Sequence, residues 1–145
     1  MRMTTIAIWT ALAALGAAGC ATDPGPGLVM TLAPSTTRVE GWLASTGELT
    51  VFPRPLKAAY DPYAEDDRAK CVSLIDATGE SGAALANLNG KRVVVTGEAV
   101  EWDALADGTA PGDRLLGKKF YGEAVVPNSC LRSYVFVARS VVVVR

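Results

Sequence analysis

The alternation of apolar and polar residues predicts a chain built mainly from β-strands. In residues 88–100, an Asn-Gly pair and two basic residues precede three consecutive valines, a Thr-Gly pair and a further valine. This β-branched run predicts a strand that is buried on both faces. Gly97, within the same segment, predicts a bend or a bulge. The other predicted elements of the fold are arranged around this strand in the sequence.

Three further strands and one helix are predicted upstream of the valine-rich segment. Residues 38–44 and 48–52 read as two strands joined by a tight Ser-Thr-Gly turn, and residues 71–76 read as a third strand. Residues 79–88 then predict a short helix, which the Asn89-Gly90 pair ends. The strands therefore come first, and the helix leads directly into the valine-rich strand.

Two long loops and a final strand complete the predicted elements. One loop covers residues 53–70, and a Gly/Asp-rich loop covers about 101–117. Residues 118–126 predict an irregular strand, and residues 134–144 predict a long valine-rich strand that ends the chain. Long loops in a compact domain are usually functional or disordered, so both loops are candidate functional regions.

The order strand, strand, strand, helix, strand, strand over residues 38–145 resembles the OB-fold, a five-stranded Greek-key β-barrel. The most specific part of the resemblance is the helix that leads through Asn-Gly into the valine-rich strand. The resemblance implies one mainly β domain with one short helix, in which the third and fifth strands are parallel neighbours. A small β-sandwich or another five-stranded barrel is the alternative.

The N-terminal segment has a different composition. Arg2 is followed by an apolar run of 14 residues, Ile6 to Gly19, which suits a signal peptide better than a membrane span. The small residues before Cys20 resemble the lipobox of bacterial lipoproteins. This implies a signal peptide over residues 1–19 and a lipid on Cys20. By the same resemblance, Ala21 after the cysteine implies sorting to the outer membrane, facing the periplasm. The alternatives are an ordinary cleavage site beside an incidental cysteine, and an uncleaved anchor.

Residues 20–37 are rich in Pro, Gly and Thr and predict the lipidated N-terminus with a flexible tether. A flexible segment of this length has an r.m.s. reach of about 20–25 Å. The tether would separate the folded domain, residues 38–145, from the membrane surface.

The three cysteines suggest one disulfide. If Cys20 carries lipid, Cys71 and Cys130 remain as a possible pair in an exported chain. The OB-fold resemblance implies that the starts of the third and fifth strands lie at the same end of the barrel, which is compatible with a Cys71–Cys130 bridge. Two separate buried thiols are the alternative.

Composition limits the possible chemistry. The 145 residues carry 14 basic and 15 acidic side chains and no histidine, so the commonest general base and metal ligand is missing. The acidic segment 61–67 lacks the spacing of a calcium-binding loop. We therefore expect no metal site and no cofactor. Paired carboxylates could still cleave a glycosidic bond, so a carboxylate-dependent hydrolase of an envelope polymer is the alternative function.

A binding role is the preferred hypothesis. In the OB arrangement the two long loops lie at the same end of the barrel, and three aromatic residues, Tyr60, Tyr63 and Trp102, are the candidate contacts with an envelope protein or a glycan. These rings could instead cap the end of the barrel. The acidic balance and the tight first turn disfavour nucleic acid as a partner. We expect a membrane-anchored binding or structural module of the bacterial envelope, without catalytic activity.

Overall fold

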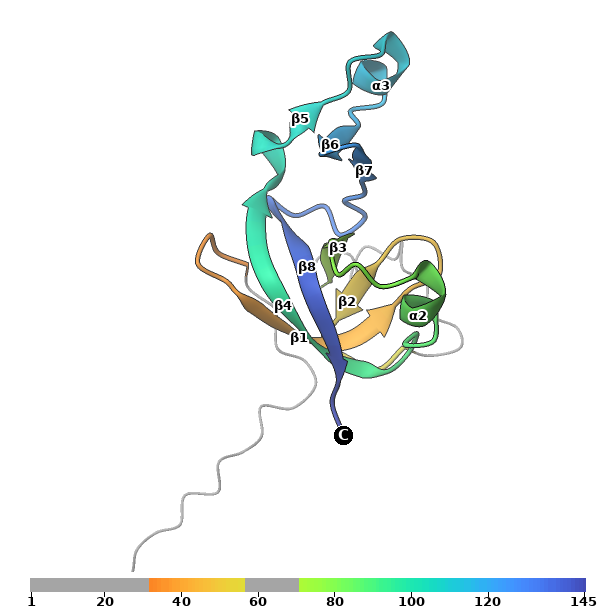
Figure 1. The fold of residues 1–145 in the computed structure, drawn as a ribbon. Helices are drawn as coiled ribbons and strands as arrows, with labels where there is room; N and C mark the ends of the chain where they lie inside the picture. The colour runs from red at the N-terminus through yellow and green to blue at the C-terminus, as the bar shows by residue number, and fades with distance from the viewer. Residues whose placement is uncertain (1–31, 57–70) are drawn as a thin grey trace, which may run out of the picture.

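A computed structural model describes residues 32–56 and 71–145. Five strands close into a barrel in the order β1-β2-β3-β8-β4 (Figure 1). The pairing of β3 with β8 is parallel and the other four pairings are antiparallel, which confirms the predicted OB-like arrangement. The barrel strands are β1 (Arg38–Ala44), β2 (Thr50–Phe52), β3 (Val72–Asp76), β4 (Arg92–Glu101) and β8 (Tyr134–Val143).

Side chains alternate between the inside and the outside of the barrel. Along β4, Val93 and Val95 are fully buried, whereas Val94 between them is partly exposed. The prediction that this strand is buried on both faces was therefore wrong. A closed barrel has a single interior, so only every second residue of a strand can enter its core. The largest core cluster includes Val39, Leu43, Val51, Val72, Leu74, Val93, Val95 and Phe136.

Two glycines allow strands to approach each other closely. The register of β4 against β8 shifts between Thr96 and Gly97, so the predicted irregularity at Gly97 is confirmed as a bulge. A Cβ atom on Gly97 would overlap the carbonyl oxygen of Val137 in β8. In β1, a Cβ atom on Gly41 would overlap the carbonyl oxygen of Phe52 in the same way. Backbone atoms therefore exclude any residue larger than glycine at both positions.

The helix α2 (Gly82–Ala86) is shorter than the predicted helix over 79–88. Ser81 is the N-cap residue of this helix: its hydroxyl accepts a hydrogen bond from the backbone N–H of Ala84 at 3.1 Å. Gly90 has a positive φ of 75° and donates its N–H to the carbonyl oxygen of Leu43 at 2.7 Å. The Asn-Gly pair thus ends the helical segment, as the sequence predicted, and also attaches it to the end of β1.

Residues 102–133 form a folded extension, which we call the projection, where the sequence predicted a loop over about 101–117 and an irregular strand over 118–126. The region of the predicted strand is an antiparallel pair of two short strands, β6 and β7. In Figure 1 the projection leaves the end of the barrel where β4 stops and returns to the start of β8. Gly117 and Gly122, both with φ near +60°, end its helix and form its hairpin turn. The prediction of a single helix is corrected, because α3 is a second one. The elements are η1 (Trp102–Ala104), β5 (Ala106–Asp107), α3 (Pro111–Leu115), β6 (Lys119–Tyr121) and β7 (Ala124–Val126).

Several predicted features lie outside the described residues. These are the predicted signal peptide, Cys20, most of the predicted tether, Tyr60, Tyr63 and the acidic segment 61–67. Within 32–56 and 71–145, no helix has the length and apolar character that are needed to cross a membrane.

Candidate functional site

A disulfide attaches the projection to the barrel. Cys71 and Cys130 are bonded with their Cα atoms 5.5 Å apart, which confirms the predicted pair. Cys71 lies just before β3 and Cys130 lies in the returning segment of the projection, and both are almost fully buried. The backbone N–H of Cys130 also donates to the hydroxyl of Ser73 in β3 at 3.2 Å. The returning segment of the projection is therefore held against the start of β3 by a covalent bond and a hydrogen bond.

The sequence separation of 59 residues gives this disulfide a large effect on the unfolded chain. Closing a loop of that size contributes about 4 kcal/mol through loss of chain entropy in the unfolded state. A disulfide of this kind is consistent with an extracytoplasmic location.

A second hydrophobic cluster joins the base of the projection to the barrel. Leu105 and Val126 of the projection pack with three barrel residues, Ile75, Val135 and Val137. The projection cannot form this cluster alone, because its strands contain only two or three residues each. Its position therefore depends on contacts with β3 and β8.

Trp102 lies at this base and is half-buried. Its ring packs against the same second cluster, and its backbone N–H donates to the carbonyl oxygen of Ser133 at 2.8 Å. The structure thus places Trp102 at the junction of the projection and the barrel, where part of the ring is buried and part faces solvent. Tyr60 and Tyr63, which were predicted to act with it, lie outside the described residues.

Ion pairs hold the short strands of the projection together. The ammonium group of Lys119 in β6 lies 2.7 Å from a carboxylate oxygen of Asp107 in β5. This hydrogen bond and charge lower the pKa of Asp107. A general acid needs a raised pKa, so the environment of Asp107 suits an ion pair and not proton donation.

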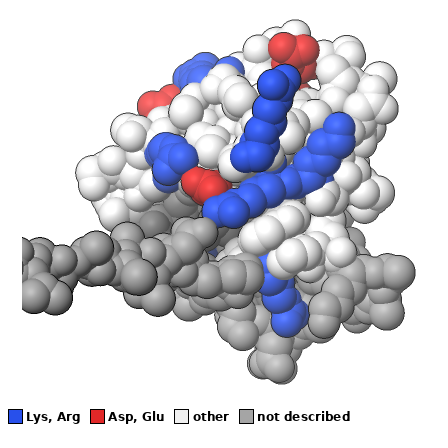
Figure 2. Space-filling view, turned by 90° about the horizontal axis from the view of Figure 1, so that it is seen from below, with Lys and Arg blue, Asp and Glu red and all other residues white. Residues whose placement is uncertain are grey.

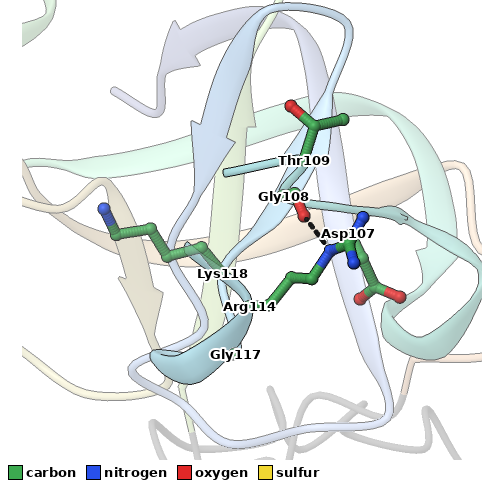
Figure 3. Close-up of a pocket in the computed structure, with 6 residues that line it drawn as sticks. All are labelled: Asp107, Gly108, Thr109, Arg114, Gly117 and Lys118. Atoms are coloured by element: carbon green, nitrogen blue, oxygen red, sulfur yellow. Dashed lines mark hydrogen bonds between the residues drawn. The ribbon is translucent and has the colours of Figure 1, made fainter. Parts of the chain in front are cut away.

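A polar pocket of about 440 Å³ opens beside α3 (Figure 3). Its two cationic side chains already have protein partners: Nε of Arg114 donates to the carbonyl oxygen of Gly108 at 3.2 Å, and Lys118 lies 2.9 Å from Asp113. In Figure 3 the Arg114 and Asp107 side chains lie close together, while Lys118 points away from them. The pocket therefore offers a polar surface, with its charges largely balanced. Its lining residues are Asp107, Gly108, Thr109, Arg114, Gly117 and Lys118.

Exposed apolar side chains are concentrated on the projection. Leu115 and Leu116, at the end of α3, are 88% and 73% exposed, and Figure 1 places α3 at the tip of the projection, far from the barrel. Leu131 and Val125, also in the projection, are exposed too. Leu131 has a positive φ of 48°, which is uncommon for a residue with a side chain. Contiguous exposed apolar groups mark interaction surfaces more often than singly scattered ones do, and Leu115 and Leu116 are adjacent in the chain.

The tip was missed in the sequence because its leucines occur inside a segment that was assigned to a Gly/Asp-rich loop. A signal was present, since the adjacent Leu115-Leu116 pair is flanked by Arg114, Lys118 and Lys119. Two adjacent apolar residues in a polar loop either anchor the loop to the core or remain exposed. The pattern alone does not distinguish these two outcomes.

Within the described ranges, no group of three or more Cys, Asp or Glu side chains is placed to hold a metal ion. Searches against models of protein families, curated proteins and solved structures find no match to this chain.

Proposed function

We propose that this protein is a lipid-anchored binding module of the bacterial envelope, which uses the projection to hold a protein or glycan partner. The observation that carries the proposal is the concentration of exposed apolar side chains on an extension that the barrel holds away from itself. Among the described residues, six large hydrophobic side chains are exposed, and four of them belong to the projection.

The attachment of the projection supports a recognition role. The disulfide and the second hydrophobic cluster fix its base, so a partner would not have to order the whole segment when it binds. A pre-organised surface loses less conformational entropy on association than a flexible loop does. The leucines at the tip supply apolar contact area, and the polar pocket beside them supplies groups that can orient a partner.

The lipid anchor in this proposal rests on the leader. The small residues before Cys20 and the apolar segment that precedes them resemble a lipoprotein signal. The disulfide adds support, since stable disulfides are typical of exported proteins. Trp102 at the base of the projection, with Tyr60 and Tyr63 as predicted neighbours, would extend the contact surface toward the barrel.

Site-specific photo-crosslinking in living cells tests the binding role. A photoreactive amino acid at Leu115 should give a discrete adduct with an envelope partner, whereas the same group at Thr78, on the loop after β3, should not. Leu116→Ser should then weaken the Leu115 adduct about tenfold or more, as expected for loss of an apolar anchor. Ala83→Ser, at an exposed position of α2 outside the projection, is the matched control and should leave the adduct unchanged.

The thermal melt of Leu116→Ser should stay within about 2 °C of the parent, because the exposed side chain contributes little to stability. Equal adducts from Leu115 and Thr78, or no adduct from either, would contradict a role of the projection in binding.

The anchor has a separate test. Cys20→Ser should leave the leader uncleaved or release the protein from the membrane fraction. Normal processing together with normal membrane association in this variant would rule out lipidation at Cys20.

A further inference from the structure

We infer that the outer face of β1, β4 and β8 lies against the anionic phospholipid head groups of the membrane that holds the anchor. This inference rests on the proposed function, because the predicted lipid would keep the domain near that membrane. It assigns an orientation: the barrel face contacts lipid, and the projection extends away from the membrane toward its partner. We call this surface the basic face, and its cationic residues are Arg38, Lys91, Arg92 and Arg145.

Strand register brings the residues of the basic face together. Trp42 of β1 lies opposite Arg92 of β4, and the backbone N–H of Val144 donates to the carbonyl oxygen of Arg92 at 2.9 Å. Arg145, the next residue, and Lys91 therefore lie at the same end of the barrel. Figure 2 shows this end, with Lys and Arg side chains gathered on it and Asp and Glu side chains between them or at the margin.

The face is cationic even after its own ion pairs are counted. Glu40 lies 2.9 Å from Arg38 and 2.7 Å from Arg92, so it offsets one of these two charges. The exposed side chains of Lys91 and Arg145 add two further positive charges. Each arginine has five N–H donors, so a single carboxylate between two of them leaves donors for phosphate oxygens.

Apolar and amphipathic groups occupy the middle of the basic face. The Arg92 guanidinium lies 5.5 Å from the centre of the Trp42 ring. In the next row, Val94 of β4 lies opposite Val142 of β8, which is 60% exposed. A half-exposed tryptophan with valines, surrounded by cations, matches the interfacial zone of a membrane, where tryptophan is enriched and cations meet anionic lipid.

The point where the chain enters the domain favours this orientation. The described chain begins at residue 32, and β1 begins at Arg38, which is itself part of the basic face. A tether that starts at a membrane lipid thus reaches the domain at this face. The projection begins after Glu101, five residues beyond Thr96, which is the β4 residue opposite Arg38. Five residues correspond to about 17 Å of extended chain.

The two tryptophans of the folded domain provide a direct test, because Trp42 belongs to the basic face and Trp102 to the base of the projection. Protein purified from cell membranes, in which the proposal has the signal peptide with Trp9 removed and Cys20 lipidated, is reconstituted in vesicles of phosphatidylglycerol and phosphatidylcholine that carry a spin-labelled head group as a fluorescence quencher. Two variants each keep one reporter: Trp102→Phe keeps Trp42, and Trp42→Phe keeps Trp102. We expect strong quenching of Trp42 and none of Trp102. The Trp42 quenching should be lost in phosphatidylcholine alone and at high salt.

Charge variants in the Trp42 reporter background sharpen the test. Lys91→Gln with Arg145→Gln removes two cations that have no role in the Glu40 ion pairs. Since each cation near an anionic surface favours contact about fivefold, the ratio of docked to undocked orientations should fall about 25-fold. The matched control, Arg114→Gln with Lys118→Gln, removes two cations of the projection and should leave the quenching of Trp42 unchanged.

Each remaining outcome overturns the inference. Protein that floats with the vesicles while Trp42 is unquenched would refute the orientation and leave the anchor intact. Quenching of Trp102 in place of Trp42 would show that the projection faces the lipid. A change in Trp42 fluorescence on addition of a single-stranded oligonucleotide, without quenching by the spin-labelled vesicles, would assign the face to nucleic acid. Failure to float at all would overturn both the anchor and the orientation.

Discussion

The barrel and the projection differ in how their side chains are used. In the barrel, strands such as β4 and β8 contain ten residues each and share one buried interior. In the projection, β5, β6 and β7 contain two or three residues each, and its largest apolar side chains at the tip face solvent. The barrel therefore provides most of the buried core of the domain, whereas the projection keeps large apolar side chains in solvent.

This difference explains why the two regions should respond differently to mutation. A core residue of the barrel touches several strands at once, so its loss affects the whole domain. A residue at the base of the projection supports only the extension, and a residue at the tip supports neither. The expected loss of stability on mutation therefore decreases from the barrel core to the base of the projection and then to its tip.

Phe136→Ala should have the largest effect. The Phe136 ring is completely buried in the barrel and lies in β8, between β3 and β4. Truncation of a buried phenylalanine costs about 3–5 kcal/mol through lost burial and the cavity that remains. Urea denaturation followed by far-ultraviolet circular dichroism should show a lower midpoint in one cooperative transition. A loss below about 1 kcal/mol would contradict the assignment of this residue to the core.

Replacing both cysteines with serine should have the next largest effect. The Cys71→Ser, Cys130→Ser variant should be destabilised by about 2–4 kcal/mol, the usual range for a native disulfide. Reduction of the parent protein should give a similar loss in a denaturation experiment, and reductant should not affect the variant. Free thiols at both positions in protein isolated from the envelope would contradict the bond.

The sequence predicted the barrel well because each barrel strand has a local signature. The residues of β1 match the predicted strand, Gly97 lies at the bulge, and Asn89-Gly90 ends the helical segment. These features follow from steric rules that act over a few residues. The parallel neighbours β3 and β8 came from the topology of the resembling fold, and the cysteines agreed with it.

The projection could not be predicted in the same way. Its strands are too short to show alternation, and β5 pairs with β6 across the whole of α3. Leu105 and Val126 become buried only because the barrel offers them Ile75 and its neighbours. The exposure of Leu115 also depends on the tertiary structure, because the local sequence does not determine which apolar side chains pack against another part of the fold. The basic face was missed for a related reason: its cations lie in or next to three strands that are distant in the sequence, while the total charge of the chain is slightly negative.

Leu105→Ala should loosen the projection and leave the barrel folded. Leu105 is 7% exposed and packs in the second cluster, so its truncation should cost about 2 kcal/mol, at the low end for a buried leucine. Hydrogen exchange should accelerate at amides of β5, β6 and β7, with little change in β1 and β2. Uniform acceleration in all strands would mean that the two regions unfold as one unit.

The smallest predicted effect is a response of the projection to acid. Lys119 lowers the pKa of Asp107 below the ordinary value of 3.8, first through a hydrogen bond and then through its charge. Because the folded-state pKa is lower than the unfolded one, the ion pair contributes its stability above pH 3.8 and loses it as the pH falls through the folded-state pKa. The carboxylate is exposed, so the effect should be small and should weaken further in salt.

Nuclear magnetic resonance titration of the Asp107 carboxyl group should give a midpoint below 3.8, and Lys119→Gln should move it upward. Acid should increase the opening of β5 amides more than that of β4 amides, and this acid dependence should be absent in Asp107→Asn. A midpoint at or above the ordinary value would show that Lys119 does not hold β5 against β6 in solution.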